Sequence, residues 1–303
     1  MPQRVYIQEV VTRDGFQSEP RFIPSEHKVA LLNALARTGL AKLEVTSFTS
    51  PKAIPNLRDA EAVMRAIDRV AGVEYCALVP NVKGCERALA CEVDEINLVM
   101  SASDSHGLAN LRMTAEQSLA QFAAILAVAE GTQVAINASL STTFGCPFEG
   151  ALGEARIFSL VERLLGLGIA RITLCDTTGM ANPRQVETLC RQLLTRWPQA
   201  TFTLHAHDTR GLGLANALAA FNAGIERFDA SLGGLGGCPY APGATGNVCS
   251  EDLVHMFEQM GVATGVDLPA LLRVAENLQA IVGHHLPGYV LRAGTADRRY
   301  APG

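Results

Sequence analysis

The chain has 303 residues, of which 48% are hydrophobic and 18% are charged, so a large core can form and extensive disorder is not expected. The formal net charge of −5, together with the lack of Lys and Arg clusters interleaved with aromatic residues, argues against a nucleic-acid partner. No leader-like segment, membrane-spanning apolar run or Cys-x-x-Cys pair is seen, so we expect a cytoplasmic protein with no membrane partner and with reduced cysteines.

Hydrophobic periodicity predicts a regular alternation of strands and helices. Strands are expected at residues 4–10, 40–45, 74–79, 93–99, 133–140, 170–174, 201–207 and 227–232. Helices are expected at residues 25–38, 56–70, 82–91, 114–130, 152–167, 183–196 and 212–223. Ser25 is the expected N-cap of the first helix, and Gly39 is its expected stop. Two more helices are expected at 251–260 and 268–282, and the tail from residue 294 to 303 should be frayed.

This alternation predicts an α/β fold, a closed (β/α)8 TIM barrel with extra C-terminal helices. The whole chain, residues 1–303, is expected to be one catalytic domain, with the barrel at about 4–249 and the additional helices at about 250–285. No GxGxxG motif follows the first strand, which disfavours a dinucleotide-binding, doubly wound sheet. The extra helices should pack beside the barrel or against a subunit partner.

The ends of the predicted strands carry many polar residues, and a TIM barrel places its chemistry at these ends. His205 and His207 are two residues apart, on one face of the seventh strand. Barrel closure makes the eighth strand a neighbour of both the first and the seventh, so Asp14 is expected to converge with the two histidines, with Asn247 available nearby. This set of O and N ligands favours Mg²⁺ or Mn²⁺ over zinc. The alternatives are two satisfied polar histidines and a turn aspartate.

Arg13 precedes the candidate ligand, and its charge would be costly beside a dication unless the substrate brings negative charge. It suits the stabilisation of a developing enolate or carbonyl oxygen, or an ion pair with Glu44, and both can hold at once. The glycine-rich segment 233–247 predicts a mobile lid that carries Cys238. This thiol is either a proton donor or acceptor, or a small buried hydrophobic residue.

These motifs resemble the 3-hydroxy-3-methylglutaryl-CoA lyases, within the wider group of metal-dependent barrel lyases and Claisen synthases. The resemblance runs from the first strand to about Val282. It rests on Arg13-Asp14-Gly15, on segments 44–48, 50–52, 80–81, 145–150, 176–177 and 205–209, and on the 233–247 loop followed by 251–253. The loop is close to diagnostic of the lyases, whereas Arg-Asp-Gly and His-x-His are shared with the synthases.

The resemblance implies a divalent cation, an acyl-CoA substrate and a retro-Claisen cleavage that releases acetyl-CoA and a keto acid. The implied cation ligands are Asp14, His205, His207 and Asn247. Arg13, partnered by Glu44, would stabilise the enolate of the departing acetyl-CoA, and Cys238 would deliver a proton to its carbon. His205 cannot easily serve as ligand and base through one nitrogen, which leaves Asp176 or a water at the cation as the base. The implied substrate contacts are Arg13, Gln17, Thr177 and His106.

The chain departs from the family around the expected acyl pocket. Where many members read Gln-Asn-Glu-Lys, this chain reads Gln-Ser-Glu-Pro at 17–20, and it loses a lysine there. In the loop 103–106, His106 either contacts the substrate or lies in solvent. Segment 139–144 reads Ser-Leu-Ser-Thr-Thr-Phe, and Cys175 stands where a glycine is common. These departures leave the predicted reaction class intact and the acyl group open.

The leading prediction is cleavage of 3-hydroxy-3-methylglutaryl-CoA to acetoacetate and acetyl-CoA, in leucine breakdown or another catabolic route. Cleavage of citramalyl-CoA to pyruvate and acetyl-CoA is the nearest alternative. A condensing synthase would usually carry a long C-terminal extension, which this chain does not show. A non-catalytic barrel that binds a CoA ester or a protein does not explain the complete ligand set. The extra helices and the resemblance also predict a homodimer.

Overall fold

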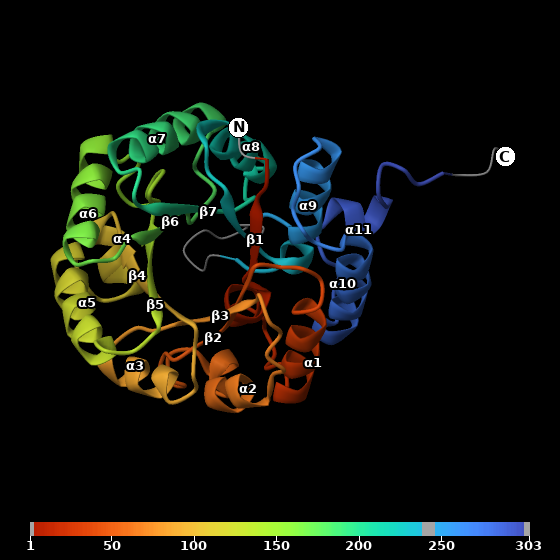
Figure 1. Cartoon of the computed structure of the whole chain (residues 1–303), viewed down its shortest axis with the longest axis horizontal. Coiled ribbons are helices and arrows are strands. Elements are labelled where there is room, and N and C mark those ends of the chain that lie inside the picture. Colours follow the sequence, from red (N-terminus) through yellow and green to blue (C-terminus); the bar gives the residue numbers. More distant parts are fainter. Residues whose placement is uncertain (1–2, 238–245, 300–303) are drawn as a thin grey trace.

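The predicted eight-stranded barrel is confirmed in the computed structural model, which describes residues 3–237 and 246–299. The strands form one closed parallel ring in the order β1 to β8, and β1 pairs with both β2 and β8 (Figure 1). The strands are β1 (Tyr6–Glu9), β2 (Lys42–Ser47), β3 (Glu74–Leu78), β4 (Glu95–Ser101), β5 (Ala135–Ser141), β6 (Arg171–Asp176), β7 (Thr201–Ala206) and β8 (Arg227–Ala230).

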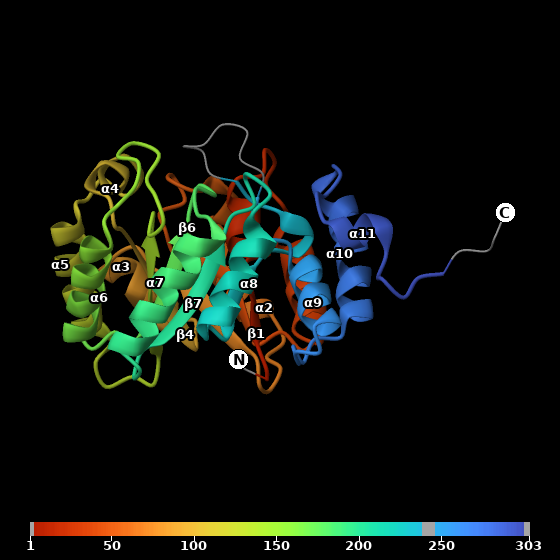
Figure 2. The ribbon, with the colours of Figure 1, turned by 90° about the horizontal axis from the view of Figure 1, so that it is seen from above.

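Helices surround this ring, and the two helices predicted after the last strand are present. The helices around the barrel are α1 (Ser25–Leu35), α2 (Ala60–Ala66), α3 (Val82–Leu89), α4 (Asp104–Asn110), α5 (Ala115–Ala129), α6 (Glu154–Gly166), α7 (Pro183–Arg196) and α8 (Gly213–Ala223). Beyond β8 come α9 (Ser250–Gln259), α10 (Leu268–Val282) and α11 (Tyr289–Ala293). These three lie together at one side of the barrel, where α9 contacts α8 and α10 contacts α1 (Figures 1 and 2).

The strands alternate between residues that face the helices and residues that face the barrel axis, as the period of two requires. On β6, Ile172 and Leu174 are fully buried in the apolar core, whereas Thr173 lines the barrel interior. The interior is strongly polar, being lined by Gln8, Lys42, Glu44, Glu95, Asn97, Asn137, Thr173 and Asp229. The cavity left between them is about 10 Å³, room for roughly one water molecule, so the barrel is a packed core and not a pore.

An ion cluster closes the amino-terminal end of the barrel. Its members are Lys42, Glu74, Glu95 and Arg171, each the first residue of its strand. Lys42 Nζ lies 2.5 Å from a Glu95 oxygen and 3.5 Å from Glu74, and Arg171 Nη1 contacts the same two carboxylates at 2.7 and 2.6 Å. The charges are therefore paired at the end of the barrel opposite the predicted chemistry.

The expectations for Ser25 and for residues 103–106 differ from the structure. Ser25 does not cap the first helix: it is the first helical residue, and its Oγ donates to Asp59 at the entry to α2 (2.7 Å). The loop expected at 103–106 is instead the start of α4, where Ser103 Oγ accepts from the backbone N–H of His106. Within the predicted lid at 233–247, residues 233–235 and 246–247 are buried, and the mobility of this segment stays a prediction. Residues 238–245 lie outside the described part.

Two further predictions concern membrane-spanning segments and the C-terminal tail. Among residues 3–237 and 246–299, no helix has both the length and the apolar character needed to cross a bilayer. The described part of the tail, residues 294–299, leads away from the barrel beyond α11 (Figure 1). Its fraying stays a prediction.

Candidate active site

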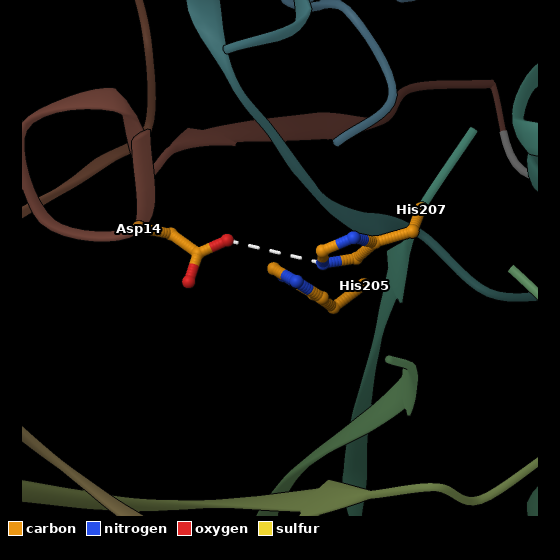
Figure 3. A group of neighbouring side chains, drawn as sticks. All are labelled: Asp14, His205 and His207. Carbon is orange, nitrogen blue, oxygen red and sulfur yellow. Dashed lines mark ion pairs between the residues drawn. The ribbon is translucent and has the colours of Figure 1, made fainter. Parts of the chain in front are cut away.

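Asp14, His205 and His207 converge at the carboxyl ends of the strands. Asp14 lies on a π-helical turn, Val11–Gly15, that directly follows β1, and the two histidines lie at the end of β7. The carboxylate points toward both imidazole rings (Figure 3). One ligand atom from each residue lies within 4.8 Å of the others, and Asp14 Oδ2 is 3.9 Å from His207 Nε2. The three side chains form a possible metal site.

The Asn247 amide completes one side of this cluster. Its Nδ2 donates to Asp14 Oδ2 (2.8 Å) and to the carbonyl oxygen of Leu235 (3.1 Å). Because a backbone carbonyl can only accept, the Leu235 contact fixes which way the amide points. Asn247 Oδ1 is then buried with no hydrogen-bond partner in the described part of the chain. Such an acceptor costs about 1–3 kcal/mol unless something satisfies it, and a hard cation would do so.

Asp229, which the sequence reasoning missed, orients His205. Asp229 lies on β8 in register with His205, and its Oδ2 is 3.2 Å from His205 Nδ1. Burial alone would lower the pKa of His205, but the Asp229 carboxylate, with Asp14, raises it above its usual value. With Nδ1 held by the carboxylate, Nε2 is the nitrogen left for a metal. The alternation of Arg227, Phe228 and Asp229 along β8 is the signal that could have identified this partner.

The expected ion pair between Arg13 and Glu44 is present. Arg13 Nε lies 2.5 Å from Glu44 Oε2, and Arg13 Nη1 also contacts Asp14 Oδ1. The other Glu44 oxygen accepts from Asn97 Nδ2 at 2.8 Å, so both oxygens are held. Burial would lower the pKa of Arg13, but Glu44 and Asp14 raise it above its usual value. The site therefore contains a largely buried, permanently charged guanidinium.

Asp14 is ionised in this setting. Burial would raise the pKa of its carboxyl group, but the charge of Arg13, then His205, His207 and the Asn247 hydrogen bond, hold it well below its ordinary value. His207 behaves in the opposite way, because burial and the neighbouring His205 lower its pKa to about 4. A carboxylate beside a neutral imidazole is the protonation state that a divalent cation requires of its ligands.

Asp176 ends β6 and presents one free oxygen. Its Oδ1 accepts from the backbone N–H groups of Met180 (2.8 Å) and Ala181 (3.1 Å), while Oδ2 is buried and unpaired among the described residues. Burial raises the pKa of Asp176 to about 6. Next to it, Thr177 Oγ1 accepts from the backbone N–H of Thr142 (2.9 Å), which ties the end of β6 to the end of β5.

The other predicted substrate contacts have different environments. His106 is fully buried on α4, with its Nδ1 3.0 Å from Ser101 Oγ, so the expectation that it lies in solvent is wrong. Its contact with substrate stays a prediction. Gln17 is half-buried just after the Asp14 turn, and its carbonyl oxygen accepts from the Asn56 side chain (3.3 Å). Cys238 lies outside the described residues.

Cys175 lies in the same layer as His205. It follows the inward-facing Thr173 by two residues and is the register partner of His205, so its thiol faces the barrel interior. Burial, and then the nearby Asp229 carboxylate, raise the pKa of this thiol well above its usual value. The side chain therefore acts as a small neutral group beside the site.

Comparison with known proteins places this geometry in a family. Residues 4–278 match the HMGL-like family model. A hydroxymethylglutaryl-CoA lyase of Bacillus subtilis is 46% identical, over 94% of this chain and 96% of the relative. An (R)-citramalyl-CoA lyase of Chloroflexus aurantiacus is 40% identical, over 96% of this chain and 95% of the relative. The solved structure of an HMG-CoA lyase from Acinetobacter baumannii, in complex with coenzyme A and 3-methylmalate, is 50% identical and superposes with a TM-score of 0.95 over 99% of this chain and 98% of that one. The chain therefore belongs to the HMGL-like family.

Proposed function

We propose that this protein is a carbon–carbon lyase that cleaves 3-hydroxy-3-methylglutaryl-CoA to acetyl-CoA and acetoacetate with the help of a divalent cation. The observation that carries the proposal is the convergence of Asp14, His205 and His207 beside the buried Arg13 guanidinium. The relatives from Bacillus subtilis and Acinetobacter baumannii, which carry this activity in their names, support the choice of substrate.

Asp14, His205, His207 and the unpaired oxygen of Asn247 would hold the cation, which we propose is Mg²⁺ or Mn²⁺. Carboxylate, amide and imidazole donors without a thiolate suit these ions. When bound, the cation would make the tertiary hydroxyl of the substrate more acidic and polarise its oxygens.

Arg13 would stabilise the negative charge that develops on the thioester oxygen as the carbon–carbon bond breaks. The cleavage leaves its electron pair on the acetyl-CoA fragment, as an enolate, and a fixed guanidinium gains most when that charge appears. Glu44, which is itself held by Asn97, holds Arg13 before the substrate arrives, so little reorganisation is needed. The enolate carbon then takes a proton, for which Cys238 is our candidate from the sequence alone.

Asp176 is the best-placed group in the described chain to take the hydroxyl proton. Its Oδ2 has no partner to give up, and a pKa of about 6 makes it a stronger base than an ordinary aspartate while leaving it mostly ionised at neutral pH. His205 is less suited to this role, because Asp229 holds Nδ1 and the other nitrogen would face the cation. We propose Thr177, His106 and Gln17 as substrate contacts around this group.

Citramalyl-CoA is the second candidate substrate, and two observations favour it. The Chloroflexus aurantiacus relative is named as a citramalyl-CoA lyase. The Acinetobacter baumannii structure holds 3-methylmalate, a five-carbon hydroxy diacid that is isomeric with citramalate.

The test is chromatographic detection of acetyl-CoA released from each of the two thioesters, with Mg²⁺ or Mn²⁺ and then with EDTA. We expect cation-dependent cleavage of the first substrate and loss of turnover in Asp14→Asn. Asp68→Asn, which removes a carboxylate in an exposed ion pair, is the matched control and should retain activity. Cleavage of citramalyl-CoA alone would make that thioester the assigned substrate, and cleavage of neither thioester would refute the proposal. The homodimer and the cytoplasmic location stay predictions, the former testable by light scattering.

A further inference from the structure

We propose that Glu9 is a positioning residue for the cation site, because it joins the two separate segments that carry Asp14 and Asn247. The inference rests on the proposed function, since it concerns the same site. Glu9 itself is the last residue of β1 and is only 2% exposed. No Lys or Arg pairs with it in residues 3–237 or 246–299, so its role is not that of an ion-pair partner.

Three hydrogen bonds define what Glu9 holds. Its Oε1 accepts from the backbone N–H of Val11 (2.9 Å) and from the backbone N–H of Leu232 (2.9 Å). Its Oε2 accepts from Ser250 Oγ (2.6 Å). Leu232 and Ser250 are each more than two hundred residues from Val11 in sequence, and each of the three donors stands at the start of a helical element.

The Val11 contact anchors the turn that carries Asp14. Val11 is the first residue of the π-helical turn, and the N–H groups at the start of a helical turn have no partner within it. The side chain of the cap residue makes no such hydrogen bond here, and Glu9 accepts from the N–H of Val11 instead. The position of the turn relative to β1 is therefore set by this carboxyl group.

The contacts with Leu232 and Ser250 anchor the segment that carries Asn247. Leu232 begins the short turn Leu232–Gly234, and Ser250 begins α9, three residues after Asn247. Two backbone hydrogen bonds also join the segments around Leu232 and Ser250. The Ser231 N–H donates to the Val248 carbonyl oxygen (3.0 Å), and the Ser250 N–H donates to the Ser231 carbonyl oxygen (3.1 Å). Glu9 thus fixes both sides of this segment to the Asp14 turn, which is what allows Asn247 to reach Asp14.

A second buried acid supports the same turn. Glu251 Oε2 accepts from the backbone N–H of Gly233 (2.9 Å), the residue next to the one that Glu9 holds, and Glu251 is fully buried. Gly233 and Gly234 both adopt positive φ, at 65° and 72°, so this turn has an unusual backbone that two side chains hold in place. Burying two carboxyl groups that have no Lys or Arg partner among the described residues costs free energy. The same burial raises the pKa of Glu9 to about 8 and that of Glu251 to about 7.

The experiment separates positioning from mere stability by measuring Mn²⁺ binding calorimetrically on purified, folded protein. In Glu9→Gln, the amide oxygen can still accept from both N–H groups, and the NH₂ can donate to Ser250 Oγ. Glu9→Leu can do neither. Leu164→Ala, a cavity variant in the fully buried face of α6, serves as the control for general destabilisation.

We expect Glu9→Leu to bind Mn²⁺ roughly 10–100-fold more weakly, the range typical when a group that supports metal ligands is removed. Glu9→Gln should stay within about threefold of the wild type, and Leu164→Ala should be unchanged. Unchanged affinity in Glu9→Leu, or an equal loss in Leu164→Ala, would overturn the inference. Should Glu9→Leu not fold, Ser250→Ala decides: a several-fold loss supports the inference and unchanged affinity overturns it. Failure of the wild type to bind Mn²⁺ would instead refute the cation site in the proposed function, and this inference with it.

Discussion

The buried pair of Arg13 and Glu44 gives a quantitative prediction for Glu44→Ala. The two side chains are 11% and 5% exposed and lie 2.5 Å apart. Removing one partner of a buried pair typically costs about 3–5 kcal/mol, because the remaining charge is left uncompensated. Here Asp14 still contacts Arg13, so we expect the lower end, about 3 kcal/mol, from the same source.

A double-mutant cycle tests this reasoning. In Arg13→Met combined with Glu44→Ala, no unpaired guanidinium remains, so the double variant should be more stable than the sum of the two single changes predicts. The assay is thermal unfolding followed by circular dichroism, in EDTA at constant protein concentration. For a chain of 303 residues, a loss of about 3 kcal/mol corresponds to roughly 5 °C in Tm. If the single effects add to within about 0.5 kcal/mol, the pair does not stabilise the site through its charges and the reasoning is wrong.

Three further predictions concern other parts of the polar framework. Asp229→Asn should weaken Mn²⁺ binding roughly 10–100-fold, because His205 loses the carboxylate that orients it, and calorimetry showing wild-type affinity would contradict this. Lys42→Met should lower the Tm, because two carboxylates, Glu74 and Glu95, are then left with Arg171 as their one cation in the cluster, while kcat/KM of the folded enzyme stays the same. A parallel loss of kcat/KM would show that the cluster also acts on the site. Burial raises the pKa of Glu9 from 4.5 to about 8, so the folded state favours the protonated form of this side chain. The contribution of this protonation to the free energy of unfolding is therefore complete below pH 4.5 and is lost as the pH rises through 8. The Tm of the wild type should therefore fall relative to that of Glu9→Gln between pH 5 and 9, and parallel Tm curves would count against the raised pKa.

The barrel could be predicted from the sequence because hydrophobic periodicity is a local signal. Eight apolar runs separated by helical patterns indicate parallel strands, and the structure closes them in chain order. The helix α4 (Asp104–Asn110) escaped prediction because it is short and has no apolar face of helical period; its Leu108 is exposed. Ser25 was expected as a cap because of its residue type, but its hydroxyl contacts Asp59, which is distant in sequence.

By itself, the sequence determined the cluster of Asp14, His205 and His207, because the His-x-His spacing and the closure of the barrel follow from strand geometry. Only the tertiary structure decided which side chains support this cluster. Asp229 reaches His205 through the register of two strands, and Glu9 reaches Leu232 and Ser250, which follow the end of the neighbouring strand β8. Local patterns carry the period of a strand, whereas such partners depend on how strands and loops are aligned, which is set when the whole core packs.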